Sequence, residues 1–227
     1  MWLQILAASV RLHELVEDAV LVDGSAAAIH VGHRMSLDDD HVIRDLTQRF
    51  DEVLEALEAT DGRAMARVER PVLILGSLQG VETGIRQLIR RRPLEVEEVP
   101  VPTGHVRVPT LAETARVKAW LVLQRNATRD YLDLAALADR LGPDAAPVLI
   151  GMDDYYADQR GADGRRISLQ LAKQLAAPAP YDLSTIDLRH YRGLLPRWQD
   201  WGEVAAVCRQ IAVAIAERTN PPEDEPT

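Results

Sequence analysis

Apolar residues recur every three or four positions over most of the chain, and a central region breaks this rhythm. The helical spacing covers residues 1–16 and 43–59 and nearly everything from 110 to 218. Short runs rich in β-branched residues, bounded by Gly, Pro or Asp, predict strands at 19–22, 35–42, 71–75, 81–88 and 94–99. Short turns between the last three favour antiparallel pairing.

The character of the chain changes after Pro109. Helical patterns then follow at residues 111–125, 129–141, 148–156, 167–176, 183–191 and 203–218. We therefore predict an α+β domain over residues 1–109, a helical domain over 110–218, and a disordered tail over 219–227, which is polar and rich in Pro.

Composition and charge narrow the class of protein. The 227 residues carry a formal net charge of −9, which argues against a protein that coats nucleic acid nonspecifically. No secretory signal or membrane-spanning run is recognisable, so we expect a cytoplasmic protein with no membrane partner. The single cysteine, Cys208, lies in an apolar helical pattern, which predicts a buried, unreactive thiol.

The stretch from residue 23 to 42 carries the first candidate chemistry. Gly24 and Ser25 open a helix of small residues, and Asp38 and Asp40 follow two positions apart in a predicted strand. Alternate strand residues share a face, so the two carboxylates should converge. A helix start favours phosphate, and Mg²⁺ prefers one or two carboxylates together with phosphate oxygens. The stretch therefore predicts a site for Mg²⁺ and a nucleotide.

Structural interpretations of the same residues stay open. A Gly-Ser pair also forms turns and helix caps, and acidic runs are common in solvated turns. The spacing of His30, His33 and His41 matches no closed zinc ligand set. A basic cluster, formed by Arg86, Arg90, Arg91 and Arg92, is either a charged strand edge or a platform for an RNA backbone.

A second group of charged residues lies in the helical part. Lys118 and Arg125 share one helix face, and Asp130 and Asp133 share a face of the next helix. Cations there could neutralise charge on a metal-bound triphosphate. Alternatively, Asp133 pairs with Arg129 and the Lys118–Arg125 face is a solvated stripe.

Two blocks together resemble a known family. The segment PTLAETARVKAWLVLQRNATRDYLDLAALADRL is similar to the K…R…RDxxDL block of the AbiEii/AbiGii toxin family of nucleotidyltransferases. The segment GSAAAIHVGHRMSLDDD resembles the GG/GS and DxD motifs of that family, in the same order. The resemblance covers about half of the chain, and little after residue 142 can be matched.

The resemblance implies a nucleotidyltransferase-like mixed-sheet domain followed by a helical domain, with a nucleoside triphosphate as substrate. It implies that Asp38 and Asp40 bind metal, that Gly24 and Ser25 hold phosphate, and that Lys118 contacts the triphosphate. Asp130 would be a distal acid of the site. Arg125 and Asp133 are weaker candidates for nucleotide binding, and the third carboxylate, Glu82 or Glu95, stays open.

The resemblance also implies a biological role. Members of the family are toxins of toxin–antitoxin or phage-defence systems, which transfer nucleotides to RNA, notably the tRNA 3′ end, and are restrained by a cognate antitoxin protein. Two alternatives are a non-catalytic nucleotide- or protein-binding module with the same fold, and a nucleic-acid-binding regulator that uses the basic cluster. The net negative charge disfavours the regulator.

Overall fold

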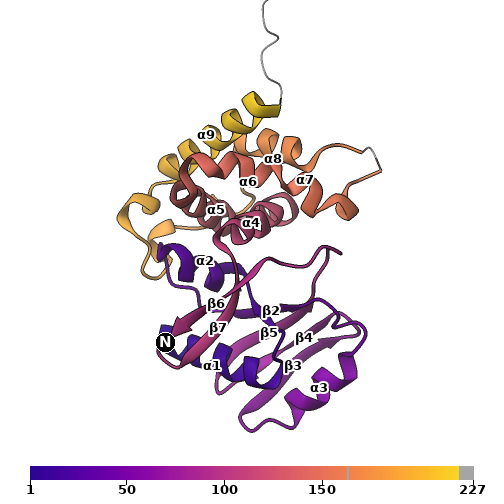
Figure 1. The fold of residues 1–227 in the computed structure, drawn as a ribbon. Helices are drawn as coiled ribbons and strands as arrows, with labels where there is room; N and C mark the ends of the chain where they lie inside the picture. The colour runs from indigo at the N-terminus through magenta and orange to yellow at the C-terminus, as the bar shows by residue number, and fades with distance from the viewer. Residues whose placement is uncertain (163, 220–227) are drawn as a thin grey trace, which may run out of the picture. The chain divides into compact units, whose positions relative to one another are not determined.

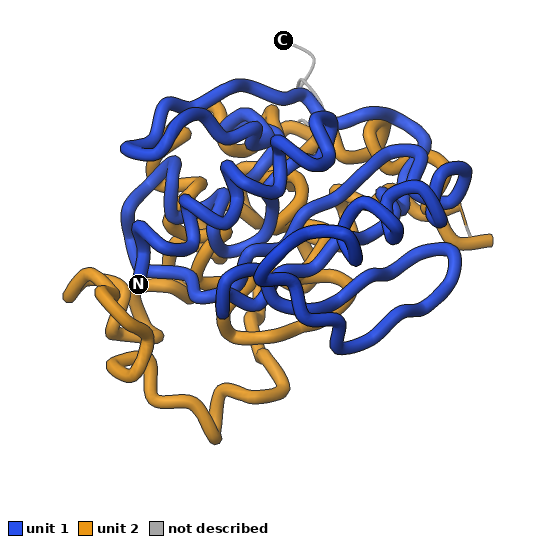
Figure 2. The backbone as a smooth tube through the Cα atoms, turned by 90° about the horizontal axis from the view of Figure 1, so that it is seen from below, with its two compact units in different colours: residues 1–114 blue, residues 115–227 orange. Residues whose placement is uncertain are grey.

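The computed structural model describes residues 1–162 and 164–219 (Figure 1). The chain forms two compact units, residues 1–114 and residues 115–227 (Figure 2). The first contains every strand of the described chain, and the second is helical there, so the fold is α+β as predicted. That residues 1–109 and 110–218 fold as separate domains stays a prediction. Of the predicted tail, all but Thr219 lies outside the described residues.

A five-stranded mixed sheet forms the centre of the first unit. Its strand order is β1-β2-β5-β4-β3. Only the pair β2–β5 is parallel, and the other neighbouring strands are antiparallel. The strands are β1 (Val20–Leu21), β2 (Asp39–Ile43), β3 (Arg63–Glu69), β4 (Leu73–Leu78) and β5 (Val81–Gln87). The mixed sheet places β2 between two neighbours, so both of its edges are paired.

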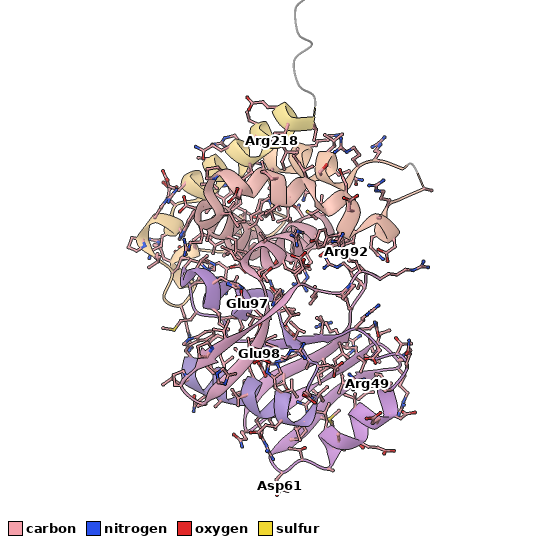
Figure 3. All side chains as sticks on the ribbon, in the orientation of Figure 1. Arg49, Asp61, Arg92, Glu97, Glu98 and Arg218 are labelled. Atoms are coloured by element: carbon pink, nitrogen blue, oxygen red, sulfur yellow. The ribbon has the colours of Figure 1, made fainter. Side chains whose placement is uncertain are left out.

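A separate antiparallel hairpin completes the strands of the first unit. It consists of β6 (Val96–Val101) and β7 (Gly104–Pro109). Glu97 and Glu98 follow each other on β6, and both are exposed (Figure 3). Val106 and Val108 of β7 are buried together with Leu21 of β1, so the hairpin packs on the unit through β7.

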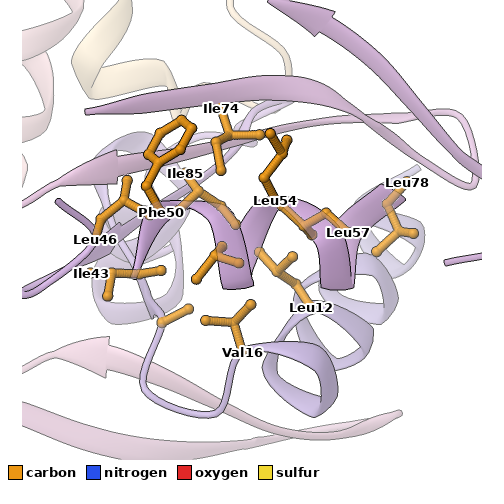
Figure 4. Packing of buried hydrophobic residues seen from close by; sticks show 12 residues of the cluster. Leu12, Val16, Ile43, Leu46, Phe50, Leu54, Leu57, Ile74, Leu78 and Ile85 are labelled. Atoms are coloured by element: carbon orange, nitrogen blue, oxygen red, sulfur yellow. The ribbon is translucent and has the colours of Figure 1, made fainter. Parts of the chain in front are cut away.

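Three helices belong to the first unit: α1 (Trp2–Leu15), α2 (Asp23–Val31) and α3 (Phe50–Glu58). Phe50, Val53, Leu54 and Leu57 recur at helical spacing, and all four side chains of this α3 stripe are buried. They pack with buried residues of α1 and of the sheet in one core, shown in Figure 4. Helix α2 ends at Gly32, which adopts a left-handed conformation (φ 57°) that suits glycine.

Several sequence predictions for the first unit are wrong in detail. Residues 35–38 are not strand, because β2 begins at Asp39, and the helix expected from residue 43 begins at Phe50. Strands β3 and β7 were not predicted. For β3 the reason is that the strand is mostly exposed and carries an irregularity between Met65 and Arg67. Gly76, expected in a turn, lies within β4, where a Cβ atom would come 2.3 Å from the Ala64 carbonyl oxygen.

Helices form the second unit. They are α4 (Leu111–Arg125, which begins in the first unit), α5 (Thr128–Leu141), α6 (Ala145–Ile150), α7 (Met152–Tyr155), α8 (Ile167–Ala176) and α9 (Trp201–Thr219). Helix α9 packs against α5, α6 and α8. The prediction of a helix over residues 183–191 is wrong, since only the short 3₁₀ turn Leu188–His190 forms there.

The buried face of α9 contains Cys208, which is fully buried as predicted. Burial raises the pKa of its thiol to about 12, which keeps the sulfur protonated and unreactive. Across residues 1–162 and 164–219, none of the helices combines the length and the apolar composition that crossing a bilayer requires.

Candidate nucleotide site

Three consecutive aspartates at the start of β2 lie in different environments. Asp38 is exposed, the side chain of Asp40 is 24% exposed, and Asp39 is 1% exposed. This alternation follows from the pleat of an extended chain, which sends alternate side chains to opposite faces. The face with Asp38 and Asp40 is therefore open to a ligand, whereas the face with Asp39 belongs to the interior.

The start of α2 is fastened to the same segment. The hydroxyl of Ser25 donates a hydrogen bond to the carbonyl oxygen of Asp38 over 2.6 Å. Gly24 is equally close to the chain that follows, because a Cβ atom there would come 2.6 Å from Arg34 Nη2 and 2.8 Å from Ser36 Oγ. A side chain at position 24 would displace these groups. The structure thus brings Gly24 and Ser25 against the segment that carries Asp38.

The neighbouring strand β5 limits the position of the Asp40 carboxylate. Gly84 pairs with Asp40 in the parallel register, and a Cβ atom on Gly84 would lie 2.5 Å from Asp40 Oδ1. Arg86, two residues along β5, places its Nε 3.9 Å from the same oxygen. The contact between Gly84 and Asp40 was not predicted from the sequence. A glycine inside a strand signals close approach of another group, but only the register shows which group.

Behind the site, the buried face of β2 carries polar groups that contact other elements. The hydroxyl of Ser9 in α1 donates a hydrogen bond to the Asp39 carboxylate. Beside it on β5, Thr83 pairs with Asp39 and accepts a hydrogen bond from Arg63 of β3. Burial raises the pKa of Asp39 from 3.8 to about 7, although the Ser9 hydrogen bond and the charge of Arg63 oppose the rise. Asp39 therefore helps to fix β2 from the interior and is not accessible to a ligand.

The histidines do not form a zinc site in the described structure. His41 is fully buried on the same face as Asp39, and burial lowers its pKa to about 3. His30 bonds to the Pro109 carbonyl oxygen over 2.7 Å. Over residues 1–162 and 164–219, no three His, Cys, Asp or Glu side chains are grouped so as to hold a metal ion.

Two carboxylates on an accessible face still suit one kind of metal. Mg²⁺ is commonly held by one or two protein carboxylates while substrate phosphates and water complete its shell. Asp38 and Asp40 supply these donors beside a helix start, so their chemistry fits Mg²⁺. Of the two candidates for a third carboxylate, Glu82 directly precedes Thr83, which pairs with Asp39, whereas Glu95 precedes β6 of the separate hairpin.

In the second unit, Lys118 lies against two aspartates. Its Nζ is 3.2 Å from Asp130 Oδ1 and 2.7 Å from Asp133 Oδ2, and all three side chains are fully buried. The interpretation of Lys118 as part of a solvated stripe is therefore wrong. Helix α4 supplies the ammonium and the first two turns of α5 supply the carboxylates, while Arg125 at the end of α4 is half-buried.

The basic cluster divides into two kinds of residue. Arg90 is 3% exposed, pairs with the buried carboxylate of Glu113, and donates to the carbonyl oxygens of Arg92 (3.0 Å) and Pro93 (3.1 Å). It organises the segment between β5 and β6, on which Arg92 lies (Figure 3). Arg86, Arg91 and Arg92 are exposed. Arg90 therefore cannot belong to a surface platform for RNA, and only Arg86, Arg91 and Arg92 remain as candidates for that prediction.

Solved structures with this arrangement of elements are known. JHP933 from Helicobacter pylori superposes with a TM-score of 0.51 at 14% identity, over 95% of both chains. A second H. pylori structure, described as a proposed nucleotidyltransferase, gives a TM-score of 0.50 at 14% identity, over 96% of this chain and 98% of that one. The fold is nucleotidyltransferase-like. The antibiotic-resistance factor ANT(2'')-Ia gives 0.51 at 10% identity, over 69% of this chain and 92% of its own.

Sequence comparison gives a different group of relatives. No known protein-family profile matches the chain. The heme uptake protein MmpL11 of Mycobacterium tuberculosis (strain H37Rv) is 42% identical over 131 residues, which is 56% of this chain and 13% of the transporter. The mycolic acid-containing lipids exporter MmpL11 of Mycolicibacterium smegmatis is 37% identical over 130 residues, again 13% of its length. A little over half of the chain thus matches a small part of these much longer transport proteins.

Proposed function

We propose that the chain is a metal-dependent nucleotidyltransferase that transfers a nucleoside monophosphate from a nucleoside triphosphate to RNA. The observation that carries the proposal is the bond from Ser25 to the Asp38 carbonyl oxygen. It ties a helix start, which favours phosphate, to a strand that presents Asp38 and Asp40 on its accessible face. A nucleotidyltransferase-like fold over nearly the whole chain supports the same reaction.

Each candidate residue has a distinct role in this proposal. Asp38 and Asp40 would hold Mg²⁺, which would neutralise charge on the phosphates and orient the attacking hydroxyl. The backbone N–H groups at Gly24 and Ser25 would bind the phosphates. Lys118, which lies against Asp130 and Asp133, would contact the triphosphate. Arg125 would bind nucleotide, and the third carboxylate would be Glu82, which lies on β5 beside the residue that pairs with Asp39.

The biological role in this proposal follows the resemblance to the AbiEii/AbiGii family. The acceptor would be the tRNA 3′ end, modification would block translation, and a cognate antitoxin protein would restrain the enzyme in the cytoplasm. Arg86, Arg91 and Arg92 are exposed cations that would contact an RNA backbone. Since Arg86 also lies near Asp40, such contacts would continue from the metal site.

The test uses two matched aspartate variants. Purified protein is incubated with each labelled nucleoside triphosphate, total tRNA and Mg²⁺, and label incorporated into RNA is measured. Asp38→Ala should reduce incorporation by at least about a hundredfold, because one of two metal ligands is lost. Asp61→Ala, an exposed acid in the turn after α3, should leave it unchanged. Full activity of Asp38→Ala would refute the assignment.

A second candidate function is favoured by the sequence relatives. A segment of the transport protein MmpL11 is 42% identical to 131 residues of this chain, which supports a non-catalytic nucleotide- or protein-binding module with the same fold. In that case the chain would bind a nucleoside triphosphate without transferring any part of it to RNA. Binding that persists with no incorporation into any RNA, under all four triphosphates, would favour this candidate.

A further inference from the structure

A cavity of about 590 Å³ lies within the second unit, among residues that have no role in the proposed reaction. Helix α4 forms one wall, helix α8 a second, and Gln159 of the 3₁₀ turn Ala157–Gln159 lines a third together with Gly161 and Arg165. Its volume is in the range of pockets that enclose small ligands. The polar and aromatic residues that line it are Trp120, Gln124, Gln159, Arg165, Lys173 and Gln174.

The cavity and the Lys118 cluster use different faces of α4. Trp120, Leu123 and Gln124 are three or four positions apart, so they share one face of the helix. Lys118 precedes Trp120 by two positions, which is roughly 200° around a helix, so its side chain leaves from the other side. The cavity is therefore separate from the contacts of Lys118 with Asp130 and Asp133.

Trp120 lines the cavity with an indole ring that is held in place. Its indole stacks on the ring of Tyr156, with ring centroids 4.6 Å apart and an angle of 12° between the planes. The residue is 9% exposed and lines the cavity. Because one aromatic ring already fixes the other, a planar ligand would meet the indole without ordering a mobile side chain.

The lining is cationic in an acidic protein. Arg165 and Lys173 both line the cavity, whereas the described residues that line it include no Asp or Glu. No carboxylate in the described part of the chain pairs with Lys173. The chain as a whole carries a net charge of −9, so this local excess of positive charge is a specific feature. Cations beside a cavity of this size favour an anion.

The amide groups add hydrogen-bonding capacity. Gln124, Gln159, Gln170 and Gln174 line the cavity, and an amide can both donate and accept. Gln174 is fixed in position, since its amide nitrogen donates to the Val122 carbonyl oxygen (2.9 Å) and to the Tyr131 hydroxyl (2.9 Å). Amides of this kind suit the edge of a heteroaromatic ring, which carries donors and acceptors side by side.

We propose that this cavity binds a small organic anion that carries a flat heteroaromatic ring, of the chemical class of a nucleoside monophosphate. The ring would contact Trp120 and the glutamine amides, and the anionic group would lie toward Arg165 and Lys173. Since the cavity uses none of the residues assigned to nucleotidyl transfer, the inference is independent of the proposed function. It adds a second ligand site, through which a nucleotide could influence the protein without being its substrate.

The test follows Trp120 directly in the full chain. The protein is labelled with 5-fluorotryptophan, which gives one ¹⁹F signal for each of its four tryptophans, and Trp120→Phe identifies the signal of Trp120. AMP, GMP, CMP and UMP are then titrated in EDTA, so that no metal-dependent site contributes. At least one of them should shift the Trp120 signal saturably while the Trp2 signal stays in place.

Charge reversal provides the matched comparison. Lys173→Glu should weaken binding of that monophosphate by about tenfold or more, because a charge-assisted contact becomes repulsive. Arg140→Glu, an equal change of charge at the exposed end of α5, should leave binding unchanged. Both variants change exposed residues, so folding is expected to persist, and the unshifted ¹⁹F signals report it.

Three results would overturn the proposal. The first is that none of the four monophosphates shifts the Trp120 signal. The second is equal affinity for Lys173→Glu and Arg140→Glu. The third is that inorganic phosphate competes as well as the monophosphate, which would reduce the cavity to a simple anion site. Because Asp38→Ala should bind the monophosphate normally, failure of nucleotidyl transfer and failure of this inference are distinguishable.

Discussion

Burial of Asp39 makes the stability of the first unit depend on pH in a direction that can be calculated. Asp39 is 1% exposed, and its pKa rises from 3.8 to about 7 on folding. Folding therefore favours the protonated acid. Its contribution to stability is gained as the pH falls from about 7 toward 3.8, and it is lost as the pH rises through the same window.

The size of the effect follows from the two pKa values. Between pH 8 and pH 5, protonation of Asp39 should stabilise the folded chain by about 2 to 3 kcal/mol. His13 and His41 act in the opposite direction, because burial lowers the pKa of each to about 3, so acidification below 6.5 favours the unfolded chain. Total stability alone would therefore not isolate Asp39.

The assay compares the free energies of unfolding in urea of Asp39→Asn and of the wild-type chain. Unfolding is monitored by circular dichroism in EDTA at pH 5 and at pH 8. Asn cannot ionise, so the variant should gain about 2 to 3 kcal/mol relative to the unchanged chain on going from pH 5 to pH 8. Asp61→Asn, at an exposed position, should show no such gain. If the relative stability of Asp39→Asn is the same at both pH values, the reasoning about burial fails.

Two further substitutions test the contacts around the candidate site. Lys118→Met leaves the carboxylates of Asp130 and Asp133 buried without the ammonium group that they contact. The free energy of unfolding in urea should therefore fall by about 3 to 5 kcal/mol. A decrease below about 1 kcal/mol would contradict the burial of these three side chains. Gly84→Ala puts a methyl group where the Asp40 carboxylate lies. Label incorporation into RNA should therefore fall by about tenfold to a hundredfold, while the urea midpoint changes little. Unchanged incorporation would show that the position of Asp40 is not critical.

Local patterns were enough to predict which candidate residues are exposed and where they lie in the helix and strand, while their roles in catalysis or binding stay predictions. Alternation in an extended segment placed Asp38 and Asp40 on one face, and the structure has Asp39 buried on the other. The Gly-Ser pair at a helix start was also correctly located, because small residues followed by an Ala-rich run are a strong helix signal. These features depend on residues within about twenty positions of each other, so the sequence contains them directly.

Features that depend on distant partners could not be predicted. The parallel pairing of β2 with β5 skips two intervening strands, and only this register sets Gly84 against Asp40. Helical spacing put Lys118 and Asp130 on defined faces but could not show that these faces meet, because charged helix residues are usually solvated. For the same reason Arg90 looked like a surface cation, although it pairs with Glu113 in the interior.

The three consecutive aspartates at residues 38–40, where β2 begins, have a consequence for how the protein tolerates change. The three aspartates are chemically identical and differ only in the side of the extended chain to which each side chain points. A shift of the strand register by one residue would therefore turn a buried aspartate outward and an exposed one inward without any change of residue type. The register of this segment therefore matters as much as the chemistry of its side chains. Insertions or deletions near residues 36–38 should abolish function more completely than a conservative replacement of the middle aspartate.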